Sequence, residues 1–198
     1  MEKAKTSLLW AAAGYELFAS EGLEGIQVER LARILQLNKS GFYHYFADLE
    51  GFCVELIKLH QHKVDALLRE ALEIKNLTPD YLLLLVKHTS TVMFQVQITR
   101  NKNQHSFYEA SEDVDRRLSL GVRHLWLAYL GSSTNSELAM RYFDFVRDTF
   151  YTRVSVRNFN FLFLHNLIND AKLLIDQVNE RVTAKASQTI PVYLDDSV

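Results

Sequence analysis

The chain has 198 residues, of which 48% are hydrophobic, and its formal net charge is −2. Its one cysteine, Cys53, excludes an internal disulfide and is typical of a reducing compartment. The most apolar run, residues 81–86, is too short to span a membrane, and the first residues lack the apolar core of a secretory signal, so we expect a cytoplasmic protein with no membrane partner.

Helical spacing of apolar residues predicts most of the elements. A first helix is expected over about 3–20 and a second over about 27–35. Asn38 is a predicted N-cap of a third helix, because its side chain can accept from the free amides of the first turn. Asp48 is the predicted cap of a fourth helix, over about 49–75.

The rest of the chain is also expected to be helical, because it holds few Gly and Pro residues and no convincing strand pattern. Thr78 is the predicted cap of a long fifth helix that ends near Arg100, with Pro79 at its first position. Further helices are predicted over about 105–110, 114–130, 136–155 and 158–182. The predicted fold is all-α with about nine helices, divided into a three-helix domain (1–48), a larger helical domain (49–185) and a loose tail (186–198).

Residues 26–46 predict a helix-turn-helix, in which two short helices are joined by a tight turn. The inward-facing residues that would fix the angle between the helices are Leu31, Leu35, Leu37, Phe42 and Phe46. Those left to project outward are Lys39, Ser40, Tyr43, His44 and Tyr45. A cation, a hydroxyl, two phenols and an imidazole suit contacts with phosphates and base edges. The alternative is that the three rings are ordinary core or interface residues.

Charge does not add to this prediction. The first 50 residues hold five basic and seven acidic residues, so their balance is also −2. Proteins that bind nucleic acid usually carry a basic face. The motif alone therefore carries the prediction of DNA binding.

Three segments of the first 55 residues resemble the N-terminal domain of the TetR/AcrR family of transcriptional regulators. They are Ala-Ala…Leu-Phe-Ala-Ser-Glu-Gly (12–22), Val-Glu-Arg-Leu-Ala (28–32) and Leu-Asn-Lys-Ser-Gly-Phe-Tyr-His-Tyr-Phe (37–46). The resemblance implies a homodimer that reads a double-stranded DNA operator, with a C-terminal domain that senses a small-molecule effector. By position it implies DNA contacts from Gln27, Glu29, Lys39, Ser40, Tyr43, His44 and Tyr45.

The sequence departs from the family pattern at several of these positions. Ile26 and Gln27 replace the usual hydroxyl pair, and Gln36 stands at a turn position that is usually Gly, at a cost of ~1 kcal/mol if its φ is positive. Leu49 stands where a phosphate-contacting Lys is usual, and Glu29 where a basic residue is common. We expect weak or unusual operator affinity, or compensation from the basic residues Lys3, Lys5, Arg30 and Lys39.

The C-terminal region is rich in aromatic residues, which with a few polar groups could line a ligand cavity. The candidate lining residues are His88, Phe94, Gln97, Phe107, Trp126, Tyr129 and Tyr151, and His124 and His165 are further polar candidates. The alternative is that the rings only fill the core.

The last long helix is apolar around most of its circumference between Phe159 and Ile175, so both of its sides must be covered. We expect a two-fold four-helix interface with the helix over 136–155. The candidate interface residues are Tyr142, Phe145, Phe159, Phe163 and Leu167. The alternative is a central core helix within one chain.

No motif indicates an enzyme. The chain has no Gly-rich phosphate loop, no His-Glu-x-x-His and no Cys-x-x-Cys, and we expect no cofactor and no metal. His60 and His62 would face different directions on a helix. The predicted function is a DNA-binding transcriptional repressor that a small apolar or aromatic ligand releases from its operator. The alternative is a TetR-like ligand-binding protein whose sequence-specific DNA binding is weakened or lost.

Overall fold

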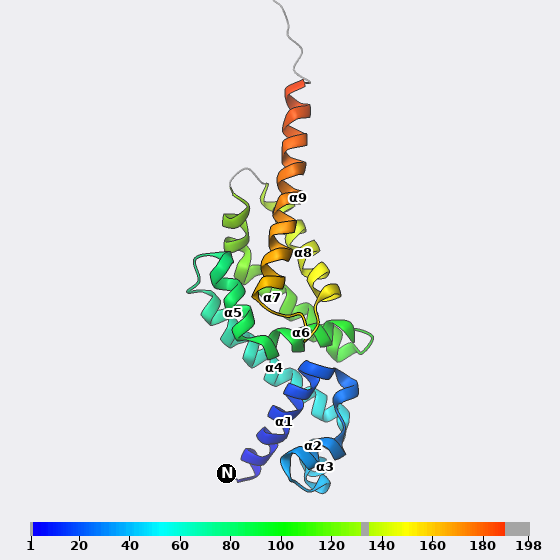
Figure 1. Cartoon of the computed structure of the whole chain (residues 1–198). Coiled ribbons are helices and arrows are strands. Elements are labelled where there is room, and N and C mark those ends of the chain that lie inside the picture. The colour runs from blue at the N-terminus through cyan, green and yellow to red at the C-terminus, as the bar shows by residue number, and fades with distance from the viewer. Residues whose placement is uncertain (1, 132–134, 189–198) are drawn as a thin grey trace, which may run out of the picture.

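The computed structural model describes residues 2–131 and 135–188, and the side chains of 5–131 and 135–181 (Figure 1). The described residues form nine α-helices and no strand, which confirms the predicted all-α fold. The helices are α1 (Glu2–Glu21), α2 (Val28–Leu35), α3 (Lys39–Phe46), α4 (Leu49–Ala71), α5 (Leu82–Lys87), α6 (Thr89–Arg100), α7 (His105–Leu130), α8 (Ser136–Arg153) and α9 (Phe161–Gln188). No described helix is long and apolar enough to cross a membrane.

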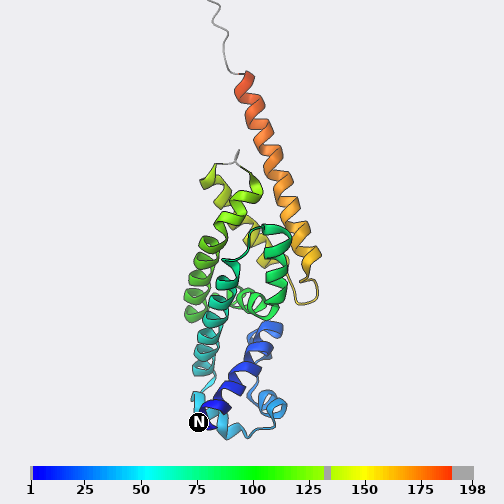
Figure 2. The ribbon, with the colours of Figure 1, turned by 90° about the vertical axis from the view of Figure 1, so that its left-hand side faces the viewer.

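Helices α1 to α3 and the start of α4 form a small head at one end of the molecule, and the rest of α4 with α5 to α9 forms the larger body (Figures 1 and 2). The head closes around the buried rings of Trp10, Phe42 and Phe52. Helix α1 also reaches the body, where Tyr15 stacks on Phe94 of α6 with ring centroids 4.4 Å apart. One apolar core therefore runs from the head into the body, and a second lies between α4, α5, α7, α8 and α9.

The two predicted caps next to α3 and α4 are confirmed. The side chain of Asn38 accepts from the Ser40 amide at 3.0 Å, and that of Asp48 accepts from the Gly51 amide at 2.8 Å. These bonds satisfy donors that a helix start leaves free. They fix where α3 and α4 begin, at Lys39 and Leu49.

The predicted fifth helix is wrong in two places. Thr78 does not cap it; its backbone is extended (φ −124°, ψ 133°) inside a short π-helical turn, Leu77–Tyr81, and its hydroxyl lies 3.3 Å from Nδ1 of His165. The helix is also broken at His88 (φ −97°, ψ 34°) into α5 and α6. There, Nε2 of His88 pairs with Glu70 on α4 at 3.0 Å, a tertiary contact that local sequence does not show.

The predicted break near residues 111–113 does not exist, because α7 is continuous from His105 to Leu130. Ser111 falls in the predicted gap and Asp115 at the predicted start of the next helix, but both are buried and hydrogen-bonded to α6. At the other end of the body, α9 runs to Gln188, past the predicted start of the tail at 186. Residues 189–198 lie outside the described part of the chain.

Candidate DNA interface and internal cavity

The turn between α2 and α3 is three residues long and well defined. Gln36 adopts the left-handed conformation (φ 56°, ψ 37°), and the Leu37 amide donates to the Ala32 carbonyl at 2.9 Å. Asn38 then caps α3. A positive φ strains a residue with a Cβ, so Gln36 carries the cost expected of it. The turn places α3 across α2, as in a helix-turn-helix.

Helix α3 is held by one face and free on the other. Phe42 is fully buried and meets Trp10 edge-on at 5.5 Å between ring centroids, and Phe52 at 5.0 Å. On the opposite side, Tyr43 is 51% exposed. Lys39, Ser40 and His44 are also exposed, whereas Tyr45 is half-buried beside Phe46. The exposed set offers a cation, a hydroxyl, a phenol and an imidazole on one helix surface.

Two of the cations expected to contact phosphate are held by carboxylates. Lys39 Nζ lies 2.8 Å from Glu29 Oε1, and this hydrogen bond lowers the pKa of Glu29. Arg30 makes a two-bond pair with Glu21, at 2.5 and 2.6 Å. When a phosphate approaches, each cation must either leave its carboxylate partner or interact with the carboxylate and the phosphate at once.

The remaining predicted contacts lie around this surface. Gln27 is exposed at the start of α2 and its side chain does not cap that helix. Lys5 is exposed on α1, whereas the side chain of Lys3 lies outside the described residues. Leu49 is 37% exposed at the start of α4. A Cβ on Gly51 would lie 2.2 Å from the Phe46 carbonyl oxygen, so only Gly allows α4 to start so close to the end of α3.

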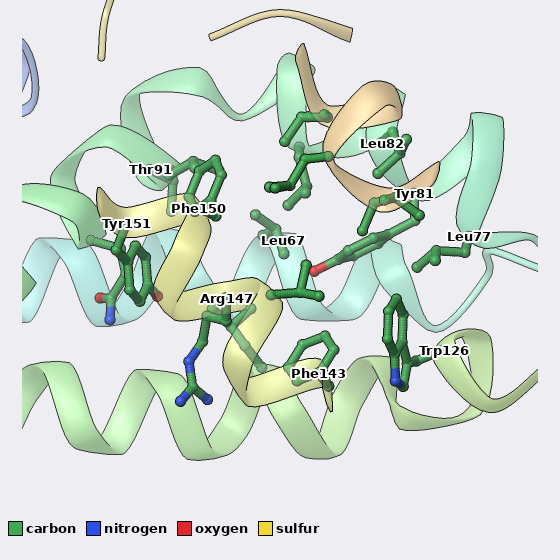
Figure 3. A pocket seen from close by; sticks show the side chains of 18 of the residues that line it. Leu67, Leu77, Tyr81, Leu82, Thr91, Trp126, Phe143, Arg147, Phe150 and Tyr151 are labelled. Carbon is green, nitrogen blue, oxygen red and sulfur yellow. The ribbon is translucent and has the colours of Figure 1, made fainter. Parts of the chain in front are cut away.

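A cavity of about 120 Å³ lies within the body, between α4, the Leu77–Tyr81 turn and helices α5 to α9 (Figure 3). Its wall is mostly aliphatic and aromatic, with Leu67, Trp126 and Phe143 among the lining residues. Two of the predicted lining residues, Trp126 and Tyr151, contribute to it.

The other predicted lining residues lie elsewhere, which corrects that part of the prediction. Phe94 and Phe107 pack on Phe18 in the core that joins head and body. His88 pairs with Glu70, and the Tyr129 hydroxyl donates to Asn169 at 2.8 Å. Gln97 lies against Gly22 in the head, His124 is exposed on α7, and His165 Nε2 lies 2.9 Å from Asn169 Nδ2.

Sequence reasoning missed several polar residues of the wall: Tyr81, Thr91, Gln95 and Arg147. Tyr81 begins the apolar run 81–86, where its sequence context does not distinguish it from an ordinary core residue. Gln95 was the one available signal, since it is an amide amid the apolar stretch Val92–Val96 and such groups need buried partners.

Gln95 belongs to a buried hydrogen-bonded chain that starts in the head. The Tyr15 hydroxyl on α1 pairs with His60 Nδ1 at 2.9 Å, and His60 Nε2 pairs with Gln95 Oε1 at 3.0 Å. The Gln95 amide donates to Asp115 Oδ1 at 2.9 Å, which also accepts from the Tyr151 hydroxyl at 2.6 Å. Burial lowers the pKa of His60 to about 4 and raises that of Asp115.

Helices α8 and α9 present apolar side chains to solvent. Of the predicted interface residues, Phe145 is 63% exposed, Tyr142 and Phe163 are half-buried, and Phe159 is buried. Leu167 lines the cavity instead. The exposed apolar residues that sequence reasoning did not single out are Leu138 on α8 and Leu162, Leu173, Leu174 and Val178 on α9.

The chain was compared with known proteins in three ways. Residues 11–56 match the family model described as bacterial regulatory proteins, tetR family. Neither the search of curated proteins nor the search of solved structures found a match. The matched segment contains the whole helix-turn-helix and the start of α4. Residues 11–56 therefore form a DNA-binding domain of the tetR type, which supports a DNA-binding transcriptional regulator.

Proposed function

We propose that this regulator is a homodimeric repressor that leaves its operator when a small apolar or aromatic molecule enters the cavity. The observation that carries the proposal is the buried polar chain, because its middle member, Gln95, is also part of the cavity wall. A ligand that displaces Gln95 or Tyr151 acts directly on a bond network that ends in the head.

The path from that network to the recognition helix is short. Tyr15 lies on α1, one turn and a half after Trp10, whose ring packs on Phe42 of α3. Buried polar groups are costly to leave unpaired, so a change at Gln95 favours a compensating shift of His60 and Tyr15. Ligand binding would thus favour a different position of the head, which is how an effector shifts a population between two states.

The dimer is supported by the exposed apolar face of α8 and α9. Phe145 and Leu173 are each more than half exposed, and the C-terminal part of α9 extends beyond the body (Figures 1 and 2). Exposed apolar side chains on two helices that pack on each other are typical of an interaction site. A two-fold partner on this face would place two heads side by side, for two half-sites about one helical turn of DNA apart.

A second function also has a specific observation in its favour. The pairs Glu29–Lys39 and Arg30–Glu21, together with Leu49 at the start of α4, reduce the free positive charge beside α3. A TetR-like ligand-binding protein with weakened or lost sequence-specific DNA binding would carry such changes.

The two functions can be separated by selecting bound sequences at low salt from a pool of random double-stranded DNA. The pool also contains DNA from upstream of the gene. The repressor predicts a selected operator that the folded dimer shifts in a gel. Tyr43→Ala and Lys39→Ala should each lose this binding with unchanged melting temperature, whereas Arg116→Ala, an exposed cation on α7, should keep it. A folded dimer that selects no sequence would instead support the second function.

A further inference from the structure

One hydroxyl that lines the cavity has no hydrogen-bond partner among the described residues. Tyr81 is 7% exposed, and its hydroxyl points into the cavity (Figure 3). Burial raises the pKa of this phenol, and no described side chain forms a hydrogen bond with it. The hydroxyl therefore faces the cavity space instead of a protein acceptor, so a ligand group that pairs with it would gain affinity.

The other uncharged polar groups of the wall are already paired, among them the Thr91 hydroxyl, which is hydrogen-bonded to Tyr15. The Tyr151 hydroxyl donates to Asp115 at 2.6 Å, and Trp126 Nε1 donates to the Ala139 carbonyl at 2.7 Å. Gln95 uses both ends of its amide, toward His60 and toward Asp115. Tyr81 is thus the hydroxyl that a ligand can engage without breaking an existing bond.

The charge of the wall argues for a neutral ligand. Of the residues found to line the cavity, Arg147 alone is charged, and its guanidinium lies 2.9 Å from Asp144, 3.4 Å from Asp148 and 4.0 Å from Asp115. Its buried Nε has no hydrogen-bond partner among the described atoms, but it already faces the Asp115 carboxylate. Because these carboxylates already neutralise the guanidinium, an anion would find no free positive charge, and a cation would meet no acid in the described lining. Either ion would therefore lose hydration without a counter-charge.

The size of the cavity argues for a ligand with about one ring. Its volume is about 120 Å³, and its wall is almost entirely apolar. A dry apolar protein cavity of about 150 Å³ takes up a benzene molecule. A ring with one small polar substituent therefore matches both the volume and the single free hydroxyl.

We propose that the cavity takes a small neutral aromatic alcohol, phenol or ketone whose oxygen pairs with the Tyr81 hydroxyl. This inference rests on the proposed function, because it names the effector class for the same cavity.

Calorimetric titration of the full-length protein with benzyl alcohol, toluene and benzoate tests it. Benzyl alcohol should bind more tightly than toluene, and benzoate should not bind. Tyr81→Phe should weaken benzyl alcohol about fivefold to tenfold, the value of one net hydrogen bond, and change toluene less than about twofold. Tyr108→Phe, at an exposed tyrosine outside the cavity wall, should change neither affinity.

A melting curve without ligand keeps the variant interpretable. Because Tyr81→Phe removes a hydroxyl with no partner, its melting temperature should be unchanged or higher. Three results would overturn the proposal: benzoate binding as tightly as benzyl alcohol, equal losses for benzyl alcohol and toluene in Tyr81→Phe, or no binding of any probe.

The gel shift reports separately on the proposed function. If benzyl alcohol binds through Tyr81 but does not change DNA affinity, the ligand class proposed for the cavity is supported and the proposal that ligand releases the protein from DNA is contradicted. If a charged compound releases the protein from DNA and none of the neutral probes binds, the ligand class proposed for the cavity is contradicted and the proposal of ligand-induced release is supported.

Discussion

At the scale of single residues, His60 is the most constrained polar group of the fold. It is fully buried between Tyr15 and Gln95, and both of its ring nitrogens are paired. Since Gln95 uses its NH₂ group toward Asp115, its oxygen accepts from His60 Nε2, and His60 Nδ1 accepts from Tyr15. The ring is therefore a neutral link with a fixed direction, and burial holds its pKa near 4.

This depressed pKa predicts a pH dependence of stability. An unfolded histidine titrates near pH 6.5, so below that pH the unfolded chain binds a proton that native His60 refuses, and stability falls as the pH falls toward about 4. Between pH 7 and pH 5 the free energy of unfolding should drop about 2 kcal/mol more in the wild type than in His60→Gln, measured by urea unfolding.

Asp115 works in the opposite direction, since its raised pKa means that the native state takes up a proton first as the pH falls. That contribution is common to both proteins and cancels in the difference. His62→Gln is the matched control, because His62 lies two residues away on α4 and is exposed. Equal pH slopes for the wild type and His60→Gln would mean that native His60 titrates normally.

At the scale of elements, local chemistry explains what could be predicted. The caps at Asn38 and Asp48 and the buried faces of α1 to α3 depend on neighbours in sequence, and the structure has them as expected. The break at His88 and the unbroken α7 depend on partners on other helices, so periodicity alone misplaced both. The cavity wall could be predicted only in part for the same reason. In the sequence Tyr81 resembles a core residue, and only the tertiary packing leaves its hydroxyl free.

The ion pair between α2 and α3 predicts how DNA affinity responds to charge. Glu29→Gln frees Lys39 from its carboxylate partner, so Lys39 can neutralise a phosphate fully. The slope of log affinity against log salt should steepen by about one, with about threefold to tenfold tighter binding at low salt. Fluorescence anisotropy on the selected operator between about 50 and 200 mM salt measures both.

Glu137→Gln provides the comparison, because it removes an equally exposed ion pair with Arg141 on α8. It should leave the salt slope unchanged. A slope that Glu29→Gln does not alter would show that Lys39 makes no phosphate contact.

At the scale of the whole molecule, the head is continuous with the body through packing and through hydrogen bonds. The stacking of Tyr15 on Phe94 and the chain through His60 and Gln95 run side by side across the same boundary. A head built this way does not swing freely, so its position follows the state of the body. In a dimer, the distance between the two heads would therefore depend both on the contact between the α8–α9 faces and on the state of the cavity.

The proposed dimer gives the last prediction. Phe145→Glu places a carboxylate on the exposed face of α8, where Phe145 is 63% exposed, so the folded monomer should tolerate it. In a two-fold interface both copies bury an unpaired charge, and the dimer dissociation constant should rise about a hundredfold, measured by sedimentation equilibrium. Operator affinity should fall with it, because one head alone reads one half-site. Leu120→Glu, at a 65% exposed leucine on α7, should leave both quantities unchanged. Unaltered dimerisation of Phe145→Glu would place the interface on another face.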